Sequence, residues 1–179
     1  MKRIFAVMSL LVIPACGGES PAPAASAPKP ADSTADRKYL LERVDEAAVV
    51  QLYADGFSAL PLKDKTLIWH LTQAAIAGRD IFYDQRYAHS LVMRDVLEAI
   101  VSHPDGVDPA TLTEVQRYTK LFWLNTGPYN NLTAQKFILK STPEALAAAA
   151  HPAEKSGAKF PSENGESLDQ LLTRLKPMF

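Results

Sequence analysis

The sequence predicts a mainly α-helical fold, α+β at most, in which a helical domain carries one or two short strands. Apolar residues recur at three- and four-residue intervals over Leu62–Gln85 and Tyr87–His103, which is the period of a helix. Asp108 and Thr142, each a capping residue followed by proline, signal two further helices. Ala47–Tyr53 has the Val and Tyr content of a strand. The chain has 179 residues, 47% of them hydrophobic, so it can bury a core.

The chain begins with the pattern of a bacterial export signal over residues 1–15. Basic residues precede the apolar run Ile4–Ile13, which is too short to span a membrane. Small Ala15 then precedes Cys16, the only cysteine, in the arrangement of a lipoprotein processing site. We therefore expect lipidation of Cys16 and a lipid-anchored protein in the bacterial cell envelope, facing the periplasm. Plain secretion with an incidental cysteine is the alternative.

Composition then separates a tether from a folded part. Residues 16–36 are dominated by Pro, Ala and Ser and lack the large apolar residues that offset ordering entropy, so we expect a disordered tether ahead of one helical domain over residues 37–179. The net charge of -1 gives no electrostatic reason to expect nucleic-acid binding. The four histidines show no metal-ligand spacing, so no metal site is predicted.

The folded part is expected to begin with a charged segment, a strand and a long helix. Arg37–Glu46 is either a short helix or the end of the tether, and the strand Ala47–Tyr53 is bounded by the turn signal Asp55-Gly56. Leu62–Gln85 is expected to be central and largely buried, because its apolar residues form one continuous face: Leu67, Leu71, Ala74, Gly78 and Phe82.

Three polar residues of this helix have both a structural and a functional interpretation. His70, beside Trp69, is expected to be a satisfied structural histidine and not a metal ligand. Arg79 and Asp80 are adjacent, and adjacent residues do not face one another on a helix. We expect them to have separate partners in a structural ion network, with substrate contact as the alternative.

The later helices are predicted from their caps and apolar stripes. The helix that starts at Asp108 has a stripe for burial: Leu112, Val115, Tyr118, Thr119 and Phe122. The helix that starts at Thr142 is expected to end at His151-Pro152. Ser167 and Gln170 form a capping box, and the leucines that follow make an apolar face that needs a partner. The end at Met178-Phe179 directly after that helix suggests a piece of a longer protein.

The stretch Leu121–Lys140 carries the strongest functional signal. An apolar helical end stops at Asn125-Thr126-Gly127-Pro128, residues that favour a turn, and a loop with Tyr129 and two asparagines follows. Ala134–Leu139 again have a helical pattern. From the spacing alone we expect an ordinary interhelical turn, with a rigid platform that presents hydrogen-bonding groups as the functional alternative.

A family resemblance rests on the same stretch. The pattern Asn125-x-Gly127-x-Tyr129, followed by Lys136-Phe137, resembles the N-terminal lobe of the dipeptidyl peptidase III family of zinc metallopeptidases. Leu67–Asp84, with Ala74–Ile81 at its centre, resembles the bacterial members, and the likeness covers Ala47–Phe179. It implies that this chain is part of the non-zinc lobe of a two-lobed hydrolase that removes dipeptides from peptide N-termini. It also implies that strands of this lobe pair with segments far later in the chain.

The resemblance further implies that the loop lines a cleft for an extended peptide. The substrate-binding residues that it assigns are Asn131, Leu132, Asn125 and Tyr129. Leu132 stands where the family has a substrate-contacting aromatic residue, and would supply apolar contact, while Asn131 would supply a hydrogen bond. Asn125, Tyr129 and Lys136 match residues that fix the shape of the loop.

The zinc-binding motif of that family, His-Glu-x-x-Gly-His with a later Glu-Glu pair, is absent from this sequence. We therefore expect no catalytic residue, no metal site and no cofactor in this chain, the zinc belonging to the full-length family. The expected partners are a peptide substrate, the membrane through Cys16, and the rest of the enzyme. The alternative is a complete, non-catalytic envelope lipoprotein whose helical domain binds a peptide or a protein.

Overall fold

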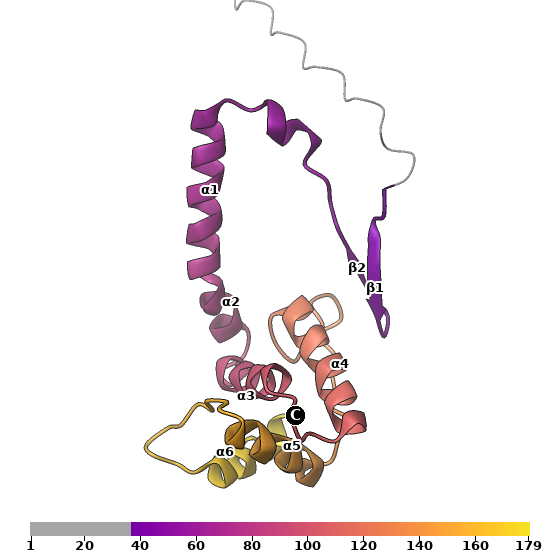
Figure 1. The fold of residues 1–179 in the computed structure, drawn as a ribbon, viewed down its shortest axis with the longest axis vertical. Helices are drawn as coiled ribbons and strands as arrows, with labels where there is room; N and C mark the ends of the chain where they lie inside the picture. Colours follow the sequence, from indigo (N-terminus) through magenta and orange to yellow (C-terminus); the bar gives the residue numbers. More distant parts are fainter. Residues whose placement is uncertain (1–36) are drawn as a thin grey trace, which may run out of the picture. The chain divides into compact units, whose positions relative to one another are not determined.

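The computed structural model describes residues 37–179, so the predictions for the signal segment, Cys16 and the tether lie outside the described residues. The prediction of a mainly helical fold with short strands is confirmed (Figure 1). The elements are, in order, β1 (Leu40–Val44), β2 (Ala47–Val50), the 3-10 helix η1 (Asp55–Ala59), α1 (Leu62–Ala77), α2 (Arg79–Arg86), α3 (Ser90–Ser102), α4 (Pro109–Asn125), α5 (Pro143–Lys155), α6 (Leu168–Leu175) and the 3-10 helix η2 (Lys176–Met178).

β1 and β2 form an antiparallel hairpin in which Val44 lies opposite Ala47. Asp45, in the tight turn, has φ 50°, a conformation that aspartate tolerates better than most residues. The predicted strand is therefore confirmed in β2, whereas the prediction of a helix or tether end over Arg37–Glu46 is wrong. Because the turn supplies a neighbouring partner strand, β2 pairs with β1 and not, within residues 37–179, with a later segment.

Ion pairs attach this hairpin to α4. Lys120 Nζ lies 2.8 Å from Glu42 Oε2, and Arg117 Nη1 lies 2.5 Å from Asp45 Oδ2. Val44, at the end of β1, is buried. The charged segment Arg37–Glu46 thus contains β1 and the turn, and its acidic side chains attach the hairpin to α4.

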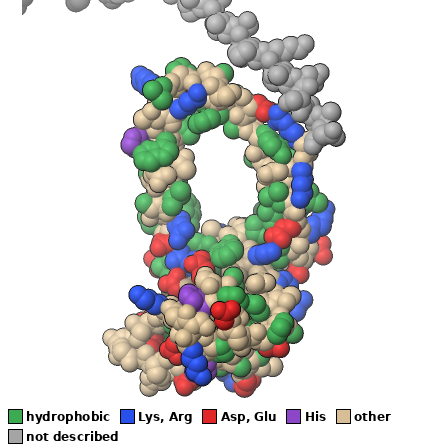
Figure 2. Space-filling view, viewed as in Figure 1, with side chains coloured by type: hydrophobic (Ala, Val, Ile, Leu, Met, Phe, Trp, Pro, Cys, Tyr) green, Lys and Arg blue, Asp and Glu red, His purple; other side chains and the backbone are tan. Residues whose placement is uncertain are grey.

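The helix predicted over Leu62–Gln85 is divided at Gly78 into α1 and α2, and the prediction that it is largely buried is wrong. The Gly78 N–H donates to Ala74 O at 3.0 Å, which closes α1. No residue of α1 is buried within residues 37–179, and Tyr83 is the buried residue of α2. Figure 2 shows hydrophobic side chains exposed along this part of the chain. The spacing of the apolar residues predicts a helix correctly, but the helix is buried only where another part of the protein packs against it.

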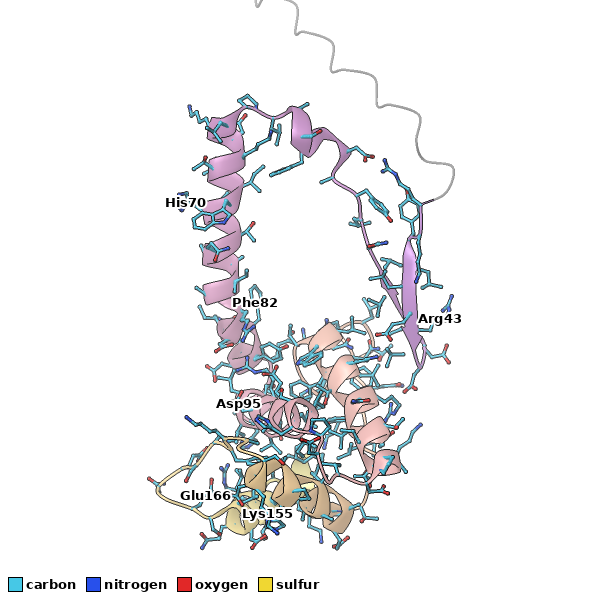
Figure 3. All side chains as sticks on the ribbon, viewed as in Figure 1. Arg43, His70, Phe82, Asp95, Lys155 and Glu166 are labelled. Carbon is cyan, nitrogen blue, oxygen red and sulfur yellow. The ribbon has the colours of Figure 1, made fainter. Side chains whose placement is uncertain are left out.

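His70 is exposed to solvent, as is most of its helix. Its ring makes an edge contact with Trp69, with 4.8 Å between the ring centroids. The side chain is exposed and projects outward from α1 (Figure 3), so the prediction of a satisfied structural histidine is wrong.

The hydrophobic core lies among α3, α4, α5 and α6. The helices predicted from Tyr87–His103 and from Asp108 are confirmed, and they supply most of the large buried side chains: Met93, Val96, Leu97, Ile100, Val115, Tyr118 and Phe122. α5 contributes small residues and α6 contributes Leu168, Leu171 and Leu175. The apolar face of α6 therefore has the partner that its sequence requires.

The helix caps are those that the sequence predicts. The Asp108 carboxylate accepts a hydrogen bond from Thr111 N at 2.8 Å, and Ser167 forms the capping box with Gln170. The prediction that α5 ends at His151-Pro152 is wrong, because the helix continues to Lys155 with Pro152 inside it. Pro152 lies in the last turn, where a missing N–H costs one hydrogen bond and buried alanines hold the helix on the core.

The structure also bears on membrane crossing. Over residues 37–179, no helix is both long enough and apolar enough to span a bilayer.

Candidate functional site

The loop between α4 and α5 begins with a sharp reversal. Thr126 adopts the left-handed conformation, with φ 51°, and Gly127 has φ 148°. The Gly127 N–H donates to Phe122 O at 3.0 Å and closes the end of α4. A Cβ at Gly127 would lie 3.1 Å from Ser90 Oγ, so both the backbone angle and the close approach to α3 favour glycine.

The Asn125 side chain connects the loop to the end of α4 through two hydrogen bonds. Its Nδ2 donates to Leu121 O at 2.9 Å, and its Oδ1 accepts from Asn131 N at 3.0 Å. The residue is 9% exposed, so both ends of the amide are used inside the protein. Asn125 therefore positions the loop and does not present a group at the surface.

A second set of hydrogen bonds closes the loop on itself. Phe137 N donates to Pro128 O at 2.8 Å, and Asn130 N donates to Gln135 O at 2.8 Å. The Asn130 side chain accepts from the backbone N–H groups at 132 and 133. Tyr129 and Lys136 form an isolated antiparallel bridge. Because these backbone groups bond across the loop, the helix expected over Ala134–Leu139 does not form.

Tyr129 anchors the loop to the core. Its ring makes an edge contact with Tyr87, with 5.6 Å between the centroids, and the side chain is half-buried. Burial raises the pKa of Tyr87, and the nearby Tyr129 hydroxyl adds to the increase. The Tyr87 phenol therefore stays neutral at physiological pH.

The tip of the loop faces solvent. Leu132 is 95% exposed, and Asn131 is exposed beside it. The four residues assigned by resemblance are thus brought together in one loop, but in two layers. Asn131 and Leu132 lie at the surface, and Asn125 and Tyr129 support them.

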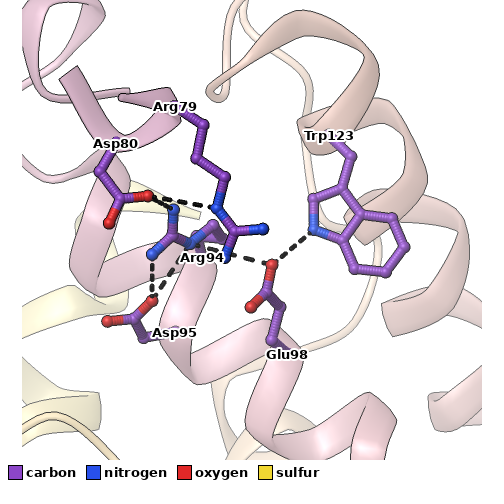
Figure 4. Close-up of polar contacts among 6 residues, drawn as sticks. All are labelled: Arg79, Asp80, Arg94, Asp95, Glu98 and Trp123. Carbon is purple, nitrogen blue, oxygen red and sulfur yellow. Dashed lines mark hydrogen bonds and ion pairs between the residues drawn. The ribbon is translucent and has the colours of Figure 1, made fainter. Parts of the chain in front are cut away.

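A polar cluster joins α2, α3 and α4 (Figure 4). Arg94, whose side chain is 9% exposed, donates to Asp80 Oδ1 at 2.6 Å and to Asp95 Oδ1 at 2.9 Å. The guanidinium carbon lies 4.9 Å from the centroid of Tyr83. The hydrogen bond from Arg94 holds the pKa of Asp80 below its usual range.

Glu98 extends this cluster to α4. Its Oε1 accepts a hydrogen bond from Trp123 Nε1 at 2.8 Å and lies 3.8 Å from Arg94 Nε. Arg79 Nε is 3.5 Å from Asp80, so Asp80 has the separate partner that was predicted, but the two neighbours also meet. An open cavity of about 310 Å³ is lined by Arg79, Tyr83, Arg94, Glu98 and Trp123.

Sequence reasoning selected Arg79 and Asp80 but missed their partners. Arg94 and Glu98 lie four residues apart on one helix, a spacing that signals an ion pair. Trp123 was interpreted as part of an apolar helical end, although its indole N–H has a carboxylate partner. The contacts of this cluster are structural, since they tie three helices together.

Metal binding within residues 37–179 would need several ligating side chains around one point. This part of the chain has no group of three or more His, Cys, Asp and Glu side chains placed to bind one ion. His151 Nε2 lies 2.9 Å from Asp169 Oδ1, which links α5 to α6. The residues described therefore do not fit a catalytic zinc site.

Comparison with known proteins adds no assignment: no protein-family model matches the chain, and no curated protein matches its sequence.

Proposed function

We propose that residues 37–179 form the substrate-binding lobe of a zinc peptidase of the dipeptidyl peptidase III kind, which removes dipeptides from peptide N-termini. In this proposal Cys16 carries the lipid anchor and the lobe faces the periplasm. The observation that carries the proposal is the braced loop between α4 and α5, which presents Leu132 above a buried support.

The loop has the properties of a peptide-binding wall. Its shape is fixed by Asn125 and by backbone hydrogen bonds, so little conformational entropy is lost when a ligand binds. Leu132 offers apolar contact to a bound peptide whatever its sequence, and the Asn131 amide can both donate and accept a hydrogen bond. Such contacts suit a binding site that accepts peptides of varied sequence.

Catalytic chemistry is not assigned to this chain. The described residues do not fit a zinc site, so no step of hydrolysis is derived from them. In the proposed enzyme, zinc would polarise the scissile carbonyl and activate water on another part of the protein. The role of the described residues is to hold the peptide in an extended form.

A binding experiment tests the loop. A fluorescently labelled, uncharged hexapeptide with a free N-terminus would be titrated with the purified chain and followed by anisotropy. We expect Leu132→Asp to weaken binding about tenfold, which corresponds to about 1.4 kcal/mol. Leu52→Asp, a change at another highly exposed leucine outside the loop, is the matched control and should leave the affinity unchanged. Equal effects of the two variants, or no binding by the wild-type chain, would contradict the proposal.

An activity experiment tests the enzyme. The protein would be isolated from the cells that produce it with an antibody to residues 37–179, and assayed for dipeptide release with and without a zinc chelator. We expect chelator-sensitive release and a native mass well above 19.6 kDa, whereas the purified 179-residue chain should release nothing. A native mass near that of lipidated Cys16–Phe179, with no release, would favour the non-catalytic lipoprotein.

A further inference from the structure

A cavity lies among α2, α3 and α4, beside the polar cluster drawn in Figure 4. It measures about 310 Å³, and two of the side chains that line it, Tyr83 and Arg94, are each only 7% exposed. The Arg94 guanidinium lies over the Tyr83 ring and donates hydrogen bonds to Asp80 and Asp95. Tyr83 and Arg94 therefore form a fixed base for the cavity, and the charge of Arg94 is already matched.

The other three lining residues carry groups that are not yet used. The Arg79 side chain is 63% exposed, and within residues 37–179 neither of its Nη nitrogens donates a hydrogen bond. Glu98 Oε1 accepts from Trp123 Nε1, whereas Glu98 Oε2 accepts no hydrogen bond from the described part of the chain. The Trp123 ring is 43% exposed. Two guanidinium nitrogens, a carboxylate oxygen and an indole ring thus remain available around one cavity.

The charges around the cavity indicate which kind of ligand it suits. The cluster has more carboxylates than guanidinium groups: Asp80, Asp95 and Glu98 against Arg79 and Arg94. A lone anion would be repelled by Glu98, and a lone cation would be repelled by Arg79. A zwitterion avoids both costs, because its carboxylate can pair with the Arg79 nitrogens while its ammonium group pairs with Glu98 Oε2.

The cavity also has the size and the apolar wall that a small zwitterion needs. Ordinary ligand sites begin at about 300 Å³, so this cavity suits a molecule no larger than an amino acid. The Trp123 ring offers a face on which an aromatic or large apolar side chain can pack. We propose that the cavity binds a free α-amino acid with such a side chain. The inference does not rest on the proposed peptidase function, because it uses different residues and a different ligand.

Nuclear magnetic resonance tests this site on the purified 179-residue chain. The sequence has two tryptophans, Trp69 and Trp123, so the nitrogen–proton spectrum of the isotope-labelled chain should contain two indole signals, and Trp123→Phe assigns them. L-Phenylalanine would then be titrated into the wild-type chain. We expect a saturable shift of the Trp123 signal and no shift of the Trp69 signal, because Trp69 lies on α1, outside the cavity.

Three further ligands test the need for both charges and their spacing. Hydrocinnamate keeps the carboxylate and phenyl ring of L-phenylalanine, and phenethylamine keeps the ammonium group and the ring. Each should bind at least about tenfold more weakly than the amino acid. The dipeptide L-alanyl-L-phenylalanine separates the two charges by a peptide unit and should also bind more weakly. Equal binding of a singly charged analogue, or equal or tighter binding of the dipeptide, would overturn the assignment.

A pair of arginine variants tests the residue that binds the carboxylate. Arg79→Gln should weaken the binding of L-phenylalanine about tenfold, since the amide cannot form a charged pair. Arg86→Gln, at an exposed arginine of the same helix outside the cavity, is the matched control and should keep the wild-type affinity. Both side chains are exposed, so both variants should fold with the wild-type urea midpoint. An unmoved Trp123 signal in the wild-type chain, or equal affinities of the two variants, would reject the site.

Discussion

Two buried polar side chains show how single residues shape this protein. Asn125 uses both ends of its amide, binding the last turn of α4 and the backbone of the loop. Arg94 is nearly buried, and its charge is matched by carboxylates from α2 and α3. A buried polar group without such partners destabilises a fold, so these residues require specific neighbours.

Replacing Asn125 tests its role in the loop. Asn125→Ala removes both side-chain hydrogen bonds and leaves the part-buried Asn131 N–H without its partner, so we expect a loss of about 2 kcal/mol in the free energy of unfolding. Urea denaturation measures this loss, and limited proteolysis should show faster cleavage between residues 126 and 136. Asn131→Ala, at an exposed side chain of the same loop, should change stability by less than about 0.5 kcal/mol. Equal losses for the two variants would contradict the bracing role.

At the scale of elements, the helices fall into two kinds. α3, α4, α5 and α6 pack against one another and share one core. α1 forms through local hydrogen bonds, but no described element covers it, and an isolated helix of its length is only marginally stable in water. The hairpin is intermediate, because Val44 is its one buried residue and two ion pairs attach it to α4.

Paired leucine substitutions separate these two kinds of helix. Leu97→Ala in α3 should lower the free energy of unfolding by about 3 kcal/mol, because the side chain is fully buried and its loss leaves a cavity. Leu71→Ala in α1 should change it by less than about 0.5 kcal/mol, since this leucine is exposed in the chain. Urea denaturation of the purified chain measures both. A large loss for Leu71→Ala would mean that α1 is already covered, for example by a second copy.

For the whole molecule, carboxylates hold the parts together. Arg94 pairs with Asp80 across α2 and α3, and Arg174 pairs with Glu166 across α6 and the preceding loop. Burial alone would raise the pKa of Glu114, but hydrogen bonds from Arg117 and from Lys140 N outweigh it and lower that pKa. Hydrogen bonds from arginines likewise lower the pKa values of Asp80 and Glu166.

Stability should therefore depend on pH in a defined direction. A carboxylate with a lowered folded-state pKa stabilises the fold at pH values above its unfolded pKa of about 4, and this contribution is lost as the pH falls through the folded-state pKa. The urea midpoint should thus decrease below about pH 4. Glu114→Gln should lower the midpoint at neutral pH and flatten the acid decrease. Glu154→Gln, at an exposed carboxylate of α5, should leave the neutral midpoint unchanged. A wild-type midpoint that rises on acidification would contradict this account.

Much of the fold was predictable because its signals are local. Capping by Asp108, Thr142 and Ser167 involves residues three positions away, and each cap forms as the sequence indicates. The apolar period likewise selects α3, α4 and α6. In the candidate site, local signals selected the turn after Asn125 but wrongly extended a helix over Ala134–Leu139, and the supporting residues Asn125 and Tyr129 were indicated only by the resemblance.

The sequence by itself thus determined the mainly helical class, the starts of α4, α5 and α6, and the position of the turn after Asn125. Only the tertiary structure decided that β1 pairs with β2, that α1 is exposed, and that Asn125 reaches across the loop to Asn131 N. It also decided that Arg94 meets Asp80, fourteen positions earlier, and that Trp123 meets Glu98. The physical reason is that caps and periods depend on neighbours along the chain. Burial and long-range pairing depend on which surfaces the folded chain brings together.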